Sequence, residues 1–142
     1  MKQVLSGLLL AVVASTANAQ TSDQRALKMA ECGFLTMSAV QEMRALPEKP
    51  DFYQDFVVSV VDFTNLYYAY SQRDRLVEGN RINDEMLNAM AAVGQEAVRK
   101  RTLAMSRENA VKLSNRLLRD CAADLKDILA RIDAAKASRS PG

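Results

Sequence analysis

The sequence predicts an all-α protein, a four-helix up-down-up-down bundle in which one disulfide joins helix 1 and helix 4. The 142 residues contain only five glycines and three prolines, and good helix formers such as Ala, Leu, Met, Glu and Arg dominate. Apolar residues recur at steps of three and four, as they do on one face of a helix. No stretch alternates apolar and polar residues beside a turn signal, so nothing predicts a β-hairpin.

The first 19 residues have the three parts of a cleaved secretory signal peptide. Lys2 supplies the positive charge, residues 4–14 are apolar except for Ser6 and Gly7, and Ala17-Asn18-Ala19 is an A-x-A cleavage site. We therefore expect a periplasmic protein with one helical domain over residues 20–136 and a disordered tail over 137–142. The rest of the chain has no apolar run near the roughly 20 residues that a membrane span needs, so no span is expected.

A first helix is expected from Thr21 to Leu46. Thr21 and Gln24 have the spacing of a capping box, and Pro47 and Pro50 follow the helix and end it. One face of this segment carries an apolar stripe that alternates in steps of three and four: Met29, Cys32, Leu35, Thr36, Ala39, Met43 and Leu46.

A second helix is expected from Asp51, as its cap, to a stop at residues 78–80, Glu-Gly-Asn. Two of its faces are apolar, so we expect it to be the most buried helix. Tyr53 and Tyr68 lie off the main stripe and are candidates for an interface, because half-exposed tyrosine is common in binding surfaces.

The segment after Asn83 is ambiguous. Apolar residues keep one heptad phase from Met86 to Ile132, and no Gly or Pro interrupts the chain between Gly94 and Pro141. Taken alone, this pattern is typical of a single helix of about 50 residues.

The two cysteines decide between one helix and two. In an oxidising compartment Cys32 and Cys121 are expected to form a disulfide, which requires Cα atoms within about 7 Å. At a rise of ~1.5 Å per residue, a continuous helix would separate the two cysteines by nearly 40 Å. A reversal near residues 103–106, with Ser106 as the cap of a fourth helix, brings them almost level. We therefore predict the reversal and the bundle.

The sequence contains no histidine. Sites that need Ser-His-Asp or Cys-His pairs, or histidine ligands for zinc or haem, are excluded within one chain. We expect a protein that is not an enzyme and has no cofactor and no metal site.

Charge is divided unevenly along the chain. Residues 20–94 carry 7 basic and 11 acidic side chains, whereas residues 95–142 carry 11 basic and 6 acidic. A cluster within residues 99–119 is a candidate site for an anionic partner, and its members are Arg99, Lys100, Arg101, Arg107, Lys112, Arg116 and Arg119. No nucleic acid is expected as a partner, because aromatic residues are not interleaved with these basic ones.

The expected function is a protein-interaction module of the periplasm that binds another envelope protein, either to block it or to hold it. In its layout (leader, about 120 helical residues, one long-range cystine) the chain resembles toxin-neutralising immunity proteins and acid-stress chaperones. This resemblance covers architecture only and implies no site residue. The alternative is a ligand carrier or a metal or stress sensor with an inter-helical cavity lined by methionines and tyrosines. Homodimerisation stays open.

We predict that the exported protein begins at Gln20, because the A-x-A site ends at Ala19. Intact-mass analysis of the envelope fraction tests this directly. A mature mass that includes residues 1–19 would contradict the prediction, and with it the argument for an oxidising compartment.

Overall fold

The computed structural model describes residues 21–71 and 84–139, which form four α-helices and, within these ranges, no strand. The helices are α1 (Ser22–Arg44), α2 (Tyr53–Ser71), α3 (Asp84–Thr102) and α4 (Arg107–Arg139). The predicted all-α class and the four helices are therefore confirmed. The predicted signal peptide and the predicted helix stop at residues 78–80 lie outside the described residues.

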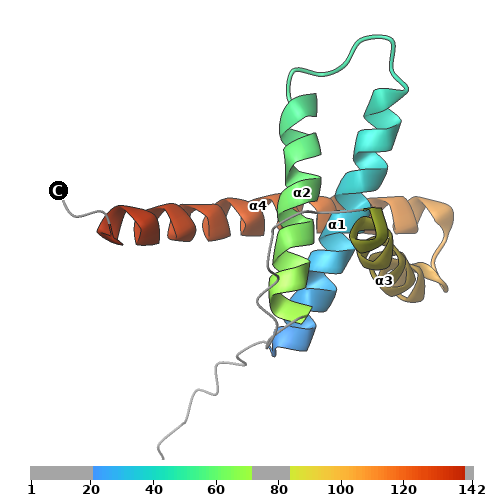
Figure 1. The fold of residues 1–142 in the computed structure, drawn as a ribbon. Coiled ribbons are helices and arrows are strands. Elements are labelled where there is room, and N and C mark those ends of the chain that lie inside the picture. Colours follow the sequence, from blue (N-terminus) through green and yellow to red (C-terminus); the bar gives the residue numbers. More distant parts are fainter. Residues whose placement is uncertain (1–20, 72–83, 140–142) are drawn as a thin grey trace, which may run out of the picture.

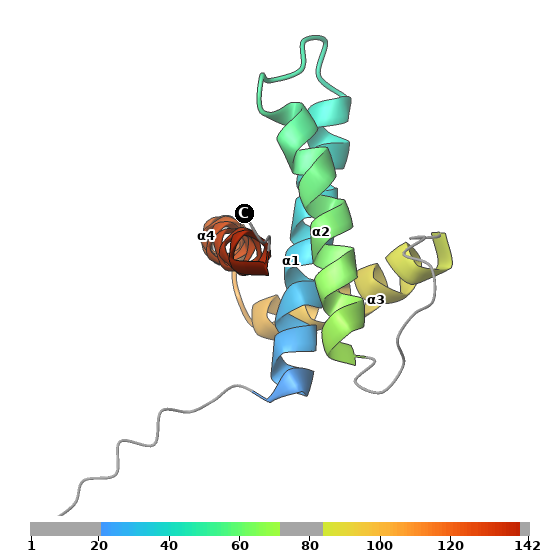
Figure 2. The same ribbon diagram turned by 60° about the vertical axis from the view of Figure 1, so that its left-hand side comes forward.

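The helices are arranged around α1. α1 and α2 run side by side as an antiparallel hairpin, and α4 passes across them at a steep angle (Figure 1). α3 and α4 lie on opposite sides of the hairpin (Figure 2), and α1 contacts each of the other three helices. The structure thus differs from the expected up-down-up-down bundle in the direction of α3 and α4, which cross α1 instead of running alongside it.

Local signals at the start of α1 predicted its cap correctly. The Thr21 backbone N–H donates to Gln24 Oε1 at 2.9 Å, and the Gln24 N–H donates to Thr21 Oγ1 at 3.2 Å. These are the two reciprocal bonds of a capping box. At the other end α1 stops at Arg44, two residues earlier than expected, and Leu46 is exposed.

The centre of α1 is buried on all sides. The four consecutive residues from Ala30 to Gly33 are buried, although they point in four different directions from the helix axis. α2 buries only Phe63 and Thr64, so the expectation that the second helix would be the most buried was wrong. α1 is the more buried helix because the other three helices all pack against it. The two apolar faces of α2 do not by themselves bring other helices into contact with it.

Two glycines allow α3 to approach α1 closely. A Cβ on Gly94 of α3 would overlap with the carbonyl group of Ala30, and it would lie 2.8 Å from Phe34 Cβ. A Cβ on Gly33 of α1 would overlap with the thioether end of Met90. The backbones of the two helices therefore meet at the Gly94–Ala30 contact with no room for a side chain.

The predicted reversal at residues 103–106 is present. The Met105 N–H donates to the Thr102 carbonyl at 2.9 Å, and the Asn109 N–H donates to Ser106 Oγ at 3.3 Å, so Ser106 caps α4. Cys32 and Cys121 form the predicted disulfide between α1 and α4, with Cα atoms 5.5 Å apart. α4 continues to Arg139, so residues 137–139 of the expected tail are helical.

We predict that Gly94→Ala lowers the free energy of unfolding by about 1–3 kcal/mol, because the added Cβ meets rigid backbone. The better helix propensity of alanine, worth about 1 kcal/mol, only partly offsets this loss. Gly33→Ala is the matched control and is expected to cost less, since the Met90 side chain can move. Urea unfolding followed by circular dichroism gives both values, and a Gly94→Ala variant as stable as the wild type would contradict the close crossing.

Candidate functional site

A hollow lies beside the disulfide, in a notch between α1, the end of α3 and α4. Its volume is about 780 Å³. Both cysteines and two leucines, Leu27 and Leu117, line it. The other lining residues are polar or charged: Thr21, Gln24, Lys28, Glu31, Arg101 and Asp120.

Glu31 is the unusual residue of this notch, because its carboxyl group is buried. The residue is only 4% exposed, and Arg101 Nη2 lies 3.1 Å from Glu31 Oε1. Oε1 nevertheless accepts no hydrogen bond from any described residue. Burial raises the pKa of Glu31 above its usual value, and the charges of Arg101 and Lys28 oppose this rise without cancelling it.

Three other polar residues of the notch, Thr21, Gln24 and Lys28, are engaged by partners within the protein. Lys28 forms an ion pair with Asp124, which ties α1 to α4. Thr21 and Gln24 are occupied by the capping box. Together with the Glu31–Arg101 pair, these contacts make the notch a structural joint between α1 and the α3–α4 turn, and they leave few free groups for a ligand.

No methionine or tyrosine lines this notch, whereas Met29 and Tyr70 line a smaller hollow of about 280 Å³ together with charged residues of α1 and α4. Met29 and Met90 are buried, and Met90 Sδ accepts a bond from Thr64 Oγ1 at 3.4 Å. Among residues 21–71 and 84–139, no group of three or more Cys, Asp or Glu side chains is placed to hold a metal ion.

The predicted basic cluster is divided by the fold into paired and unpaired residues. Arg99 binds both carboxylate oxygens of Glu96 at 2.7 and 2.8 Å, and Lys100 lies 3.7 Å from the same group. Arg101 is turned toward Glu31, and Lys112 pairs with Glu108 at 2.5 Å. Within the described part of the chain, the cluster members without an ion pair are Arg107, Arg116 and Arg119.

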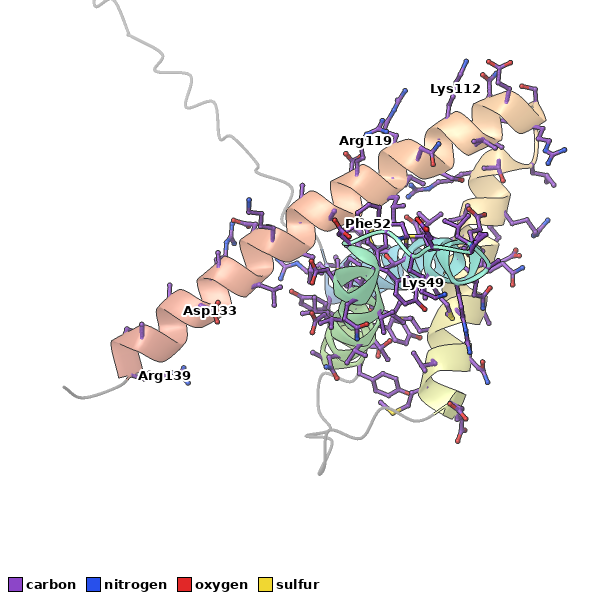
Figure 3. The ribbon with its side chains drawn as sticks, turned by 90° about the horizontal axis from the view of Figure 1, so that it is seen from above. Lys49, Phe52, Lys112, Arg119, Asp133 and Arg139 are labelled. Carbon is purple, nitrogen blue, oxygen red and sulfur yellow. A yellow bond between two sulfur atoms is a disulfide. The ribbon has the colours of Figure 1, made fainter. Side chains whose placement is uncertain are left out.

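Three members of the predicted basic cluster form a row on α4. Lys112, Arg116 and Arg119 are exposed and share one face of the helix through their spacing of four and three residues. In Figure 3, Lys112 and Arg119 extend from the side of α4 that faces away from the α1–α2 hairpin. Lys126, seven residues after Arg119, is exposed on the same face and was not among the predicted site residues. Its heptad spacing was the signal that could have found it.

The two predicted interface tyrosines are not brought together. Tyr53 and Tyr68 are both half-buried, and Tyr68 packs edge-on against Tyr67 with ring centroids 5.7 Å apart. Fifteen residues of helix place them about 22 Å apart, at opposite ends of α2.

A group of exposed apolar side chains lies in and just after the α3–α4 turn, and none of them was among the predicted site residues. Leu103 is 72% exposed, Met105 is 44% exposed and Val111 is 52% exposed. We call these three residues the apolar tip. The sequence did contain a signal for this group, since the predicted reversal at residues 103–106 includes a leucine and a methionine.

Comparison with known proteins finds no matching family model, no similar curated protein and no similar solved structure. No helix in the described ranges has the length and apolar character needed to cross a membrane. The disulfide is typical of a protein that folds outside the reducing cytoplasm.

We predict that Glu31→Gln makes the protein more stable than the wild type at neutral pH. Because folding raises the pKa of the Glu31 carboxyl group, the protonated form of this group favours the folded state, and its full contribution to stability is present below its usual pKa of 4.5. This contribution is lost as the pH rises through the pKa that the group has in the folded protein. The advantage of the variant should therefore shrink in acid. Urea unfolding from roughly pH 3 to pH 7 measures the difference.

Glu42→Gln is the matched control, because Glu42 is exposed on the same helix and should show no such difference. A Glu31→Gln variant that is less stable than the wild type at pH 7 would mean that the attraction of Arg101 outweighs the cost of burial.

Proposed function

We propose that the protein is a non-enzymatic module of the periplasm that binds another envelope protein through the exposed face of α4. The leader-like residues 1–19 and the disulfide support the compartment. The absence of histidine from the sequence supports a binding role over a catalytic one.

The observation that carries this proposal is the pair Arg116 and Arg119. Both are exposed, both lack an ion pair among the described residues, and they stand one helical turn apart beside Lys112. Like charges at this spacing destabilise a helix by about 0.2–0.5 kcal/mol. Contact with an acidic partner would replace this repulsion by attraction. Arginine suits such a partner, because each guanidinium group can bind a carboxylate through two hydrogen bonds.

The fold leaves this face accessible. α4 crosses α1 at the disulfide, with Cys121 on the inner side, and it extends well beyond the hairpin toward its C-terminal end (Figures 1 and 3). The basic row therefore lies on a long, straight helix. A partner can lie along it without any rearrangement of the core, as in a preformed interface.

We predict that a photo-crosslinker in place of Ala123 captures an envelope protein in cells. Ala123 is exposed and lies on the same face of α4, between Arg119 and Lys126. Arg116→Glu combined with Arg119→Glu should reduce the adduct at least tenfold, because charge-assisted contacts would be replaced by repulsion. Adduct mass and yield are read from a denaturing gel and by mass spectrometry.

Two controls make the result specific. Arg44→Glu with Lys49→Glu changes the net charge equally at the exposed far end of the hairpin and should leave the adduct unchanged. A crosslinker in place of Gln54, exposed on α2, should not give the same adduct. No adduct at position 123, or an adduct that survives the double reversal on α4, would rule the proposal out.

A further inference from the structure

The apolar tip combines strongly exposed apolar side chains with an ordered turn. Leu103 and Met105 are exposed on a turn that is held by the Met105–Thr102 and Asn109–Ser106 hydrogen bonds, and Val111 is exposed in the following helix α4. A turn of this kind needs no leucine or methionine, because polar residues form it equally well. Large apolar side chains held in water on a fixed turn mark a surface that something covers.

Basic side chains surround the apolar tip. Residues 99–112 contain five basic residues and one acidic residue. The side chains of Lys100 and Lys112 are 71% and 66% exposed, and their ion pairs with Glu96 and Glu108 are weak because they lie in water. Arg107, in the first turn of α4, has no ion pair in the described ranges. The surface that covers the tip should therefore be apolar beneath and negatively charged at its edge.

The tip is also a projecting corner. α3 and α4 meet there at an angle, and in Figure 3 this corner points away from the α1–α2 hairpin. Leu103 and Met105 belong to the connection between these two helices, and basic residues precede and follow it in the sequence. Long basic side chains can bury their stems while their charged ends remain at a polar boundary.

We propose that the apolar tip inserts into the surface of an anionic lipid bilayer, with Leu103 and Met105 at the boundary between headgroups and acyl chains. Arg99, Lys100, Arg107 and Lys112 would then lie at the level of the lipid phosphates. A bilayer fits this tip better than a protein does, because a fluid surface accepts a projecting apolar corner without a matching pocket. The inference does not rest on the proposed protein partner, whose contact is assigned to Arg116 and Arg119.

The experiment uses the absence of tryptophan from the chain. Leu103→Trp places a single fluorophore at the tip, and Val58→Trp places one at a site on α2 that is 51% exposed. The exported, oxidised protein is mixed with vesicles that contain phosphatidylglycerol, or with vesicles of phosphatidylcholine alone. We expect a blue shift and quenching by brominated lipid for the Leu103→Trp variant with the anionic vesicles, and no change for the α2 control.

Binding variants separate insertion from simple attraction. Leu103→Asn with Met105→Asn should reduce partitioning into anionic vesicles at least tenfold, since the buried apolar area is lost. Lys100→Ala with Arg107→Ala should reduce it about 25-fold, at roughly fivefold for each basic residue near the surface. These side chains are exposed, so unchanged circular dichroism and melting temperature are expected and serve as the folding control.

Three results would overturn the proposal. The first is an unchanged emission spectrum of the Leu103→Trp variant with anionic vesicles, with Met105→Trp as a second probe that gives the same answer. The second is equal binding of the Leu103→Asn, Met105→Asn variant, which would show adsorption by charge alone. The third is a shift in the Leu103→Trp emission that appears only with the protein crosslinked at position 123, which would assign the tip to that partner.

Discussion

The disulfide between α1 and α4 is the constraint on which the rest of the structure depends. Among the side chains that the structure describes, α4 contributes Cys121 and Leu125 to the apolar cluster that it shares with the hairpin. The disulfide closes a loop of 89 residues and so lowers the conformational entropy of the unfolded chain, which stabilises the fold by about 4 kcal/mol. It also forces the reversal after Thr102, which places the exposed turn at a corner and leaves one face of α4 open.

Sequence reasoning worked where a few neighbouring residues decide the outcome. The capping box at Thr21, the Ser106 cap and the cystine each follow from local chemistry or from chain length. It failed for the directions of α3 and α4 and for the burial of α1, because both depend on which helix lies at the centre. For α3, the missing side chain of Gly94 lets the helix meet α1 at Ala30, and no periodic pattern shows that contact.

The basic cluster illustrates the same limit at the level of the site. Its seven members could be predicted from composition, but their availability depends on acidic residues brought near by the fold. Glu31 lies 70 residues before Arg101 in the sequence, and this separation hides their contact. What remains after pairing is a smaller and more specific surface, centred on Arg116 and Arg119.

The Gly94–Ala30 contact also limits how this sequence can change over evolution. No side chain larger than hydrogen fits at position 94 unless the two helices separate, and separation would open the core between α1 and α3. Substitutions at positions 30, 33 and 94 are therefore interdependent, whereas the outer face of α4 can vary one residue at a time. Distant homologues should retain this small-residue crossing long after their surface charges have diverged, which makes it the feature by which they can be recognised.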